Sequence, residues 1–301
     1  MRLGILIFSE PAQEQYAQAD RIEEAARARG HEVKKIYSPS LSFTHDQQNG
    51  LRIFHDGQLL PELDIIICRP NYLEEPSLHT HVTGLLATAG YRLLNGGRNI
   101  WITKNKLAQH DLFLEARIPM PGWAVARSPE QAYEAQKRLG FPIIMKTAFG
   151  TQGKGIFYAD STETFFPIVD YLNVRDKNPI ILEKFIGEAN RKDIRVFTVG
   201  DRIVASMQRS ARPGDVRSNA SIGGTGSVIE PTDEEQKLAL KVTRLFSLDI
   251  AGVDLLRSNR GPLVIEVNAN PGFKELERVT GIDVASAIVE EAERRVLSAA
   301  S

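Results

Sequence analysis

The sequence predicts a mixed α/β chain, and two patterns carry this prediction. Over residues 1–95, short apolar runs alternate with segments long enough to be helices, which is typical of a small parallel α/β domain. From residue 180 onward, apolar runs follow one another through short polar turns such as Asp201-Arg202, which is typical of an antiparallel sheet. We therefore expect an α/β (α+β) protein with a parallel sheet near one end and an antiparallel sheet near the other.

The elements can be assigned in order along the chain. In the first unit, we expect strands over 2–8, 32–36 and 63–69 and helices over 12–29 and 77–89. In the second unit, we expect a helix over 104–116, a Pro-rich connector, a strand-helix-strand segment ending at Lys146, a Gly-rich hairpin and a helix over 163–172. In the third unit, we expect strands over 180–186, 194–200 and 203–209, a helix over 234–246, a hairpin over 251–272 and a helix over 285–297. With a polar linker over 173–179, this order predicts domains over 1–95, 96–179 and 180–301.

The hairpin AGVDLLRSNRGPLVIEVNANPG sorts its side chains by parity. The apolar side chains expected to face the core are Ala251, Val253, Leu255, Leu263, Ile265 and Val267. We expect residues 259–261 to form a three-residue loop, which sets Asp254 opposite Glu266 and leaves Asn268 on the same face. Two carboxylates and an amide oxygen suit a hard cation such as Mg²⁺. The alternative is a solvated hairpin face with a chance pair of acids.

A Gly-rich stretch over 150–155 joins two strands of the second unit. Its glycines would let backbone N–H groups approach phosphate oxygens, although the spacing matches neither a Walker A loop nor a Rossmann fingerprint. An ordinary hairpin turn is the alternative. Lys146 strengthens the phosphate interpretation, because it ends an otherwise apolar strand where a buried ammonium needs an anionic partner. Otherwise its side chain reaches the surface.

Composition predicts a soluble cytoplasmic enzyme. With 37 Lys and Arg against 38 Asp and Glu, no overall charge favours a nucleic-acid partner. No apolar segment is long enough to cross a membrane, and the opening RLGILIF lacks the pattern of a signal peptide. Cys68 lies in the apolar run LDIIIC, where we expect a buried thiol. Residues 191–217 carry a local excess of basic side chains, suited to phosphates or acidic acceptors, or otherwise forming a solvated strand face.

A series of segments, taken in order, resembles the ATP-grasp fold. The segments are Lys106, Lys146, the Gly-rich stretch, EKFI at 183–186, DIRVFTVGD from Asp193, GDVRSN from Gly214, Asp254 and EVNANPG. More narrowly, the chain resembles the family of the ribosomal-protein S6 modification enzyme (RimK-type) and related α-L-glutamate ligases. The resemblance is dense over 106–283 and thin over 41–60. It implies an ATP-grasp fold behind an N-terminal parallel α/β (pre-ATP-grasp) domain, with ATP and Mg²⁺, or Mn²⁺, as cofactors.

The resemblance also implies a role for each matching residue. The implied nucleotide-binding residues are Lys106, Lys146, Gly150, Gln152, Gly153, Gly155, Glu183, Lys184, Phe185, Ile186, Asp193, Arg217, Ser218 and Asn219. The implied metal ligands are Asp254, Glu266 and Asn268, and the implied catalytic residues at the reacting phosphoryl group are Arg217 and Asn219. Because the backbone of 183–186 is implied to receive the adenine, its side chains should matter less. Asp193 is implied to lie near the ribose, or else is a turn acid at the start of a strand.

The implied reaction is ATP-dependent carboxylate-amine ligation. A carboxylate attacks the γ-phosphate of Mg-ATP, and an amine then captures the acyl phosphate to form an amide. The implied donor is glutamate or another amino acid, and the implied acceptor is a protein C-terminus or a small molecule. We expect residues 223–226 to form a loop that closes over the intermediate and excludes water. Relatives are commonly homo-oligomers, so a dimer or tetramer is implied.

Two other functions remain open at this point. One is a regulatory module that holds ATP without turnover, and the other is a kinase of the same fold that phosphorylates a hydroxyl. Ser210 and Pro213 depart from the pattern of relatives, which leaves the acceptor and the role of the Arg209 and Arg212 region open. Arg69 follows an apolar strand at the carboxyl end where open α/β sheets bind ligands. It could meet the acceptor or the phosphate, or simply end the strand at the surface.

Overall fold

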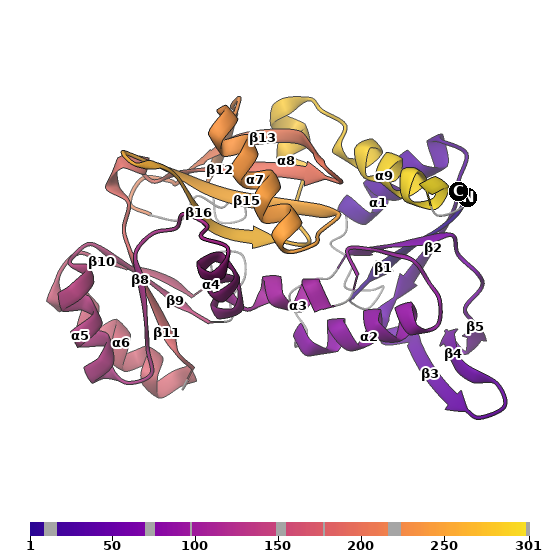
Figure 1. The fold of residues 1–301 in the computed structure, drawn as a ribbon, viewed down its shortest axis with the longest axis horizontal. Coiled ribbons are helices and arrows are strands. Elements are labelled where there is room, and N and C mark those ends of the chain that lie inside the picture. Colours follow the sequence, from indigo (N-terminus) through magenta and orange to yellow (C-terminus); the bar gives the residue numbers. More distant parts are fainter. Residues whose placement is uncertain are drawn as a thin grey trace.

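The first unit is built on a parallel sheet. The computed structural model describes residues 1–8, 17–69, 76–96, 98–148, 155–176, 178–215 and 224–298. The sheet has the strand order β2-β1-β6-β7 (Figure 1). Its strands are β1 (Arg2–Ile7), β2 (Glu32–Tyr37), β6 (Ile65–Arg69) and β7 (Leu93–Leu94), and its helices are α1 (Ala17–Ala28) and α2 (Pro76–Thr88). The apolar runs in β1 and β6 are buried almost throughout, as expected for parallel strands covered on both faces.

A second, antiparallel sheet projects from this unit and was not expected from the sequence. It has the order β3-β4-β5, with β3 (Leu41–Asp46), β4 (Gly50–His55) and β5 (Gln58–Leu59). Asp56 and Gly57 both have positive φ, as in the tight turn that joins two hairpin strands. Asn49-Gly50 and Asp56-Gly57 are the dipeptides that favour such turns, so the sequence carried a usable signal for this sheet.

The second unit is a four-stranded antiparallel sheet with two helices. The sheet has the order β10-β9-β11-β8. The strands are β8 (Trp123–Ala126), β9 (Ile143–Thr147), β10 (Ile156–Ala159) and β11 (Ile180–Lys184), and the helices are α5 (Pro129–Leu139) and α6 (Thr162–Asp176). We expected the strand that begins at 180 to open the third unit, but β11 pairs with β8 and β9. The expected linker over 173–179 is also shorter, because α6 continues to Asp176. These pairings place β11 in the sheet of the second unit.

A pair of short helices joins the first unit to the second. We expected one helix over 104–116, but the structure has α3 (Arg98–Lys104) and α4 (Lys106–Glu115). Asn105 separates them, because its side chain accepts hydrogen bonds from the backbone N–H groups of Leu107 and Ala108 and caps α4. Lys106 therefore begins a new helix instead of lying inside a longer one.

The third unit is a five-stranded antiparallel sheet with the order β14-β13-β12-β15-β16. Its strands are β12 (Lys192–Val199), β13 (Arg202–Ser210), β14 (Thr225–Val228), β15 (Ile250–Ser258) and β16 (Gly261–Asn268). Its helices are α7 (Asp233–Leu245), α8 (Lys274–Thr280) and α9 (Val284–Ser298), and short 3₁₀ turns cover Ser38–Ser40 and Gly187–Ala189. We expected residues 223–226 to be a closing loop, but Thr225 and Gly226 are paired with β13.

The hydrophobic core unites the first and third units. One cluster combines Leu6 and Phe8 of the first unit with Val253 and Leu255 of β15. A second cluster also draws on both units, and α9 packs against α1. The second unit has a separate cluster, formed by the apolar faces of its sheet, α5 and α6. The chain therefore folds as one large body and one smaller body, and the chain enters the smaller body after α3 and α4 and leaves it after β11 (Figure 1).

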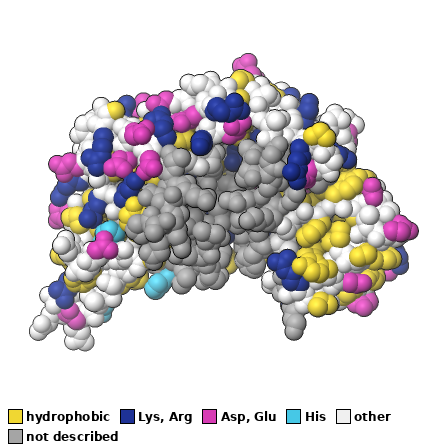
Figure 2. Space-filling model, turned by 180° about the vertical axis from the view of Figure 1, so that it is seen from behind, with side chains coloured by type: hydrophobic (Ala, Val, Ile, Leu, Met, Phe, Trp, Pro, Cys, Tyr) yellow, Lys and Arg dark blue, Asp and Glu magenta, His cyan; other side chains and the backbone are white. Residues whose placement is uncertain are grey.

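The smaller body exposes apolar side chains on its outer surface. Figure 2 shows hydrophobic side chains gathered on one side of this unit. Phe166, Tyr171 and Val174 of α6 are among its exposed hydrophobic residues. Among the described residues, no helix has the length and apolar composition needed to cross a bilayer.

Candidate functional site

The hairpin of β15 and β16 places Asp254 opposite Glu266, as the sequence predicts. The expected three-residue loop is wrong, because Ser258 pairs with Gly261 and only Asn259 and Arg260 lie between them. A bulge after Asp254 adds one residue to β16 and restores the expected pairing. The bulge also changes which side chains reach the core. Val264 and Val267 are buried there, whereas the expected core residues Leu263 and Ile265 are only half-buried.

Asp254 is held by two buried arginines, one from the neighbouring strand β12 and one from β13, the strand beyond it. Arg195 lies directly across from Asp254 on β12 and binds both of its carboxylate oxygens, with Nη2 at 2.7 Å from Oδ2. Arg209 of β13 lies 2.9 Å from the same Oδ2 and also donates two hydrogen bonds to Asp193. Burial alone would raise the pKa of Asp254, but the charges and hydrogen bonds of the two arginines lower it. Asp254 is therefore an ionised carboxylate, and Asp193 is tied to it through Arg209.

Lys146 is buried and paired, which excludes the alternative of a surface lysine. It is 5% exposed, and its Nζ lies 2.6 Å from Oε2 of Glu183 on the neighbouring strand. His110 of α4 lies 3.4 Å from the other oxygen of Glu183 and stacks on Trp123. Burial would raise the pKa of Glu183, but Lys146 and His110 lower it to about 2. The Glu183 side chain therefore has a structural role in addition to its predicted place beside the adenine, because its carboxylate balances the charge of Lys146.

Lys106 connects the lysine cluster with the hairpin acids. Burial lowers its pKa, and its electrostatic neighbours are Glu266, Lys146 and Glu183. Its backbone N–H donates to the carbonyl of Ala148, which fixes the start of α4 against the end of β9. The two expected lysines therefore share an electrostatic environment with Glu266, one of the expected acids of the hairpin. Lys104, which the sequence did not single out, is also buried, with Glu266 among its electrostatic neighbours.

Asp254, Glu266 and Asn268 are the residues that could hold a divalent cation, and both oxygens of Asp254 also accept hydrogen bonds from Arg195 or Arg209. Asp254 and Glu266 are a directly opposed pair on adjacent strands, and Asn268 is two residues further along the same strand. The amide of Asn268 donates a hydrogen bond of 3.2 Å to Glu266, which leaves its carbonyl oxygen as the group available to a metal. Two carboxylates and an amide form the hard-oxygen donor set that Mg²⁺ prefers.

In the segment that follows β11, two of the backbone N–H groups expected to receive the adenine are already hydrogen-bonded within the protein. The N–H of Lys184 donates to Gly122, and the N–H of Phe185 donates to Pro142. A base bound along Lys184, Phe185 and Ile186 would have to use other backbone groups of this segment.

Of the Gly-rich stretch, the structure describes Gly155. This residue has φ of 83°, and a Cβ there would lie 2.6 Å from Oγ1 of Thr147. Gly150, Gln152, Gly153, Arg217, Ser218 and Asn219 lie outside the described residues.

Two buried carboxamides that the sequence did not reveal, those of Gln109 and Asn95, hold the β15–β16 hairpin. Gln109 of α4 accepts a hydrogen bond of 2.8 Å from the N–H of Val267, which lies between Glu266 and Asn268. Its amide nitrogen donates to the carbonyl of Thr103 at 2.7 Å. Val267 thus has a fixed partner on the side of β16 that faces away from β15. Nothing in the spacing of α4 distinguishes Gln109 from an ordinary helical glutamine.

Asn95 holds the base of the same hairpin. Its amide nitrogen donates to the carbonyls of Ile250 and Ala269, and its oxygen accepts from the N–H groups of Asp249 and Ile250. Ala269 directly follows Asn268, so one side chain spans the start of β15 and the end of β16. Asn95 has a φ of 55°, a backbone conformation that asparagine tolerates better than most residues.

Comparison with known proteins identifies the family of this fold and site. Residues 103–292 match the model of the RimK-like ATP-grasp domain. The chain belongs to the RimK-like ATP-grasp family. It is 36% identical over 92% of its length to a probable alpha-L-glutamate ligase of Xanthomonas euvesicatoria pv. vesicatoria, 93% of which is covered. It is 35% identical over 91% of its length to the ribosomal protein bS6--L-glutamate ligase of Escherichia coli O81, 91% of which is covered.

Solved structures of RimK-like and other ATP-grasp proteins share the fold. The ATP-grasp ligase PsnB superimposes with a TM-score of 0.76 at 18% identity, covering 98% of each chain. A RimK domain protein from Sphaerobacter thermophilus gives a TM-score of 0.71 at 16% identity, covering 97% of this chain and 100% of the other. The expected family and the expected ATP-grasp fold are therefore confirmed, and the chain belongs to a family of ATP-dependent acid–amino-acid ligases.

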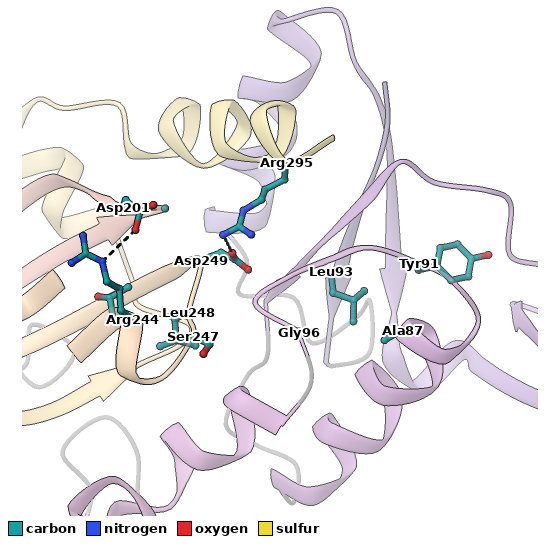
Figure 3. Close-up of a pocket in the computed structure, with 12 residues that line it drawn as sticks. Ala87, Tyr91, Leu93, Gly96, Asp201, Arg244, Ser247, Leu248, Asp249 and Arg295 are labelled. Carbon is teal, nitrogen blue, oxygen red and sulfur yellow. Dashed lines mark hydrogen bonds and ion pairs between the residues drawn. The ribbon is translucent and has the colours of Figure 1, made fainter. Parts of the chain in front are cut away.

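A cavity of about 570 Å³ lies elsewhere in the molecule, and none of Lys106, Lys146, Asp254 and Glu266 lines it. That cavity lies between the first unit, at Tyr91 and Leu93, and the end of the third sheet (Figure 3). Its charged lining residues are paired with one another, as Arg244 with Asp201 and Arg295 with Asp249. The cavity therefore belongs to the junction between the units.

Proposed function

We propose that the chain ligates the amine of glutamate, or of a similar amino acid, to a carboxylate with consumption of ATP. The observation that supports this proposal most directly is that α4, which begins at Lys106, contacts both the end of β9, next to Lys146, and β16, which carries Glu266 opposite Asp254. These are cations suited to phosphates and oxygens suited to a divalent cation, brought together from α4, the second sheet and the third sheet. Membership of the RimK-like family and the names of its glutamate ligases support the reaction type.

The reaction proceeds in two balanced steps. The acceptor carboxylate attacks the γ-phosphorus of ATP, the bond to the β-phosphate oxygen breaks, and ADP leaves. The amine of the donor then attacks the carbonyl carbon of the acyl phosphate, inorganic phosphate leaves, and the amine loses a proton. The chain's task is to hold the reactants and to balance charge, because phosphoryl transfer requires little covalent help from the protein.

Each described residue of the site supports one part of this reaction. Lys106 and Lys146 hold the phosphates as point charges, and the ion pair with Glu183 keeps the Lys146 side chain in position. Asp254, Glu266 and Asn268 would hold Mg²⁺, or Mn²⁺, which neutralises charge on the transferred phosphoryl group. Arg195 and Arg209 orient Asp254 and keep it ionised. We assign phosphate and intermediate binding to Gly150, Gln152, Gly153, Gly155, Arg217, Ser218 and Asn219, adenine binding to Lys184, Phe185 and Ile186, and a place near the ribose to Asp193.

Relatives suggest the class of acceptor. One relative is a ribosomal protein bS6 ligase, and PsnB was solved with a minimal precursor. We propose a protein or peptide carboxylate as the acceptor, with a small molecule as the second choice, and a homo-oligomer as the working assembly. Light scattering of the purified chain measures the assembly directly.

The test is ADP release from Mg-ATP with each of the twenty amino acids, alone and with candidate carboxylates, followed by mass spectrometry. ADP that appears only with glutamate, together with a product heavier by one glutamate less water, supports the proposal. ADP formed without any amine, together with a stable phosphoester, would identify a kinase. ATP binding without ADP release in any mixture, including protein acceptors, would identify a regulatory module.

A further inference from the structure

Arg69 is a buried cation at the carboxyl end of β6. Its side chain is 5% exposed, so the alternative of a surface arginine is wrong. Its Nη2 donates to Oε1 of Gln18 at 2.8 Å and to the carbonyl of Pro271 at 3.2 Å, and the guanidinium lies 5.5 Å from the ring centre of Phe273. Its Nη1 is buried and has no hydrogen-bond partner among the described residues.

The charge of Arg69 is not balanced as that of its neighbours is. Arg195 and Arg209 are buried to a similar extent, and each is bound to a carboxylate. No carboxylate of the described residues lies within ion-pair distance of Arg69. Burial lowers its pKa to about 10, so the group remains charged near neutral pH. A buried guanidinium with two N–H groups that make no hydrogen bond costs free energy of desolvation, and an anionic ligand that accepts from them offsets that cost.

Arg69 faces the reaction site from the N-terminal unit. Pro271, which accepts its hydrogen bond, lies three residues after Asn268 in the segment that follows β16. Arg69 is also an electrostatic neighbour of Lys104, which in turn is influenced by Glu266. The carboxyl end of a parallel strand is where α/β sheets bind ligands. Arg69 therefore contacts the segment that directly follows Asn268 and lies in the electrostatic neighbourhood of Lys104.

We propose that Arg69 binds a carboxylate of the incoming amino acid, a role that depends on the proposed ligase function. An amino acid that reacts through its amine always keeps its α-carboxylate, and glutamate keeps a side-chain carboxylate as well. The acceptor, by contrast, needs no carboxylate except the one that reacts. Lys106 and Lys146 already supply cations for the phosphates in the proposed function, so the substrate anion that still needs a cationic partner is the carboxylate of the donor. The two N–H groups of Nη1 match such an oxygen.

The test compares glutamate with its two monoamides, glutamine and isoglutamine, in wild type and in Arg69→Gln and Arg69→Lys. In the wild type, the monoamide that lacks the recognised carboxylate should show a KM about 10- to 100-fold higher than glutamate. Arg69→Gln should raise the KM for glutamate by a similar factor and abolish that difference. The KM for ATP and for the acceptor should stay unchanged, and Arg69→Lys should recover part of the loss.

Several controls separate this role from a structural one. Gln18→Ala removes a hydrogen bond to Arg69 but keeps its charge, so it should raise the KM for glutamate only a few-fold. Thermal unfolding shows whether each variant folds, and calorimetric binding of glutamate in the presence of a non-hydrolysable ATP analogue removes any dependence on turnover.

Three results would overturn the assignment. A rise in the KM for ATP would place Arg69 on the phosphate, and a rise confined to the acceptor would place it on that substrate. An unchanged preference for glutamate over both monoamides in Arg69→Gln would remove it from recognition altogether. If the wild type releases no ADP in response to glutamate and does not bind it, the proposed function itself fails, and the role of Arg69 fails with it.

Discussion

Asp254 and Glu266 face each other across the β15–β16 hairpin, but among the described arginines only Arg195 and Arg209 bind this pair, and both bind Asp254. Asp254 is 2% exposed and contacts Arg195 and Arg209, whereas Glu266 is half-buried. The two acids therefore have different surroundings although they occupy paired positions. Substitution of either acid should therefore affect turnover alike, whereas only substitution of Asp254 should greatly affect stability.

We expect Asp254→Asn and Glu266→Gln each to reduce Mg²⁺-dependent turnover by at least about 100-fold, because each removes a charged oxygen ligand. Asp254→Asn should also lower the free energy of unfolding by about 3 kcal/mol, since it leaves Arg195 and Arg209 short of an anion. Glu266→Gln should lower it by less than about 1 kcal/mol. Steady-state rates across a Mg²⁺ titration and urea unfolding of both variants measure the two effects. An Asp254→Asn protein with wild-type turnover would remove this residue from the metal site.

Lys146 and Glu183 form one ion pair, but their substitutions should have different effects on ATP affinity and stability. Lys146→Ala should raise the dissociation constant for ATP about 10- to 100-fold, because a charged contact to phosphate is lost. Glu183→Gln leaves Lys146 buried without its anion, so it should lower stability as well as ATP affinity. Calorimetric titration of ATP into both variants checks this. Unchanged ATP affinity in Lys146→Ala would mean that the lysine serves only the fold.

The same pair predicts a pH dependence of stability. The pKa of Glu183 is about 2 in the folded protein, below its ordinary value of 4.5. A depressed pKa contributes stability above pH 4.5, and this contribution is lost as the pH falls toward 2. The difference in unfolding free energy between wild type and Glu183→Gln should therefore be constant near neutral pH and shrink between pH 4.5 and 2. Because all other acids titrate in both proteins, a difference that does not change over this interval would contradict the ion pair.

The sequence predicted most of the order of the elements because apolar periodicity is local. It missed the local hairpins of β3, β4 and β5 and the break between α3 and α4, and it also failed where pairing is not local. β11 was assigned to the wrong sheet, since an apolar strand does not state its neighbours. The need of Lys146 for an anion was evident, but Glu183 as that anion was not, because it comes from a different strand. The pairing of Asp254 with Glu266 was correct although the loop was wrong, because the bulge adds the residue that the loop lacks.

Gln109 should act on metal affinity through Val267. Gln109→Ala removes the acceptor of the Val267 N–H, so we expect a Mg²⁺ requirement about 10-fold higher and a loss of stability of about 1–3 kcal/mol. Gln131 is a matched control, because its side chain also accepts a backbone N–H, that of Arg127, but on an exposed helix of the second unit. Gln131→Ala should leave the Mg²⁺ requirement unchanged. Equal Mg²⁺ titration curves for Gln109→Ala and Gln131→Ala would reduce Gln109 to a structural residue.

The absence of a side chain at Gly252 allows Pro271 and Arg195 to pack closely against β15. It pairs with Asn268, and a Cβ at this position would lie 2.6 Å from Cβ of Pro271 and 3.0 Å from Cδ of Arg195. Gly252→Ala must therefore displace the loop that follows the metal ligands or the arginine that holds Asp254. We expect a loss of stability of about 1–3 kcal/mol from overpacking and a larger proportional loss of turnover.

Gly84 of α2 provides the matched glycine control for this prediction. Nothing lies within 4 Å of a Cβ at Gly84, and the residue is in a helix. Gly84→Ala should therefore raise stability by about 0.5–1 kcal/mol and leave turnover unchanged. Thermal unfolding and ADP release measured side by side on the two alanine variants check both expectations. Wild-type stability and turnover in Gly252→Ala would show that Pro271 and Arg195 can move without cost, and the close approach at β15 would then not be needed for the reaction.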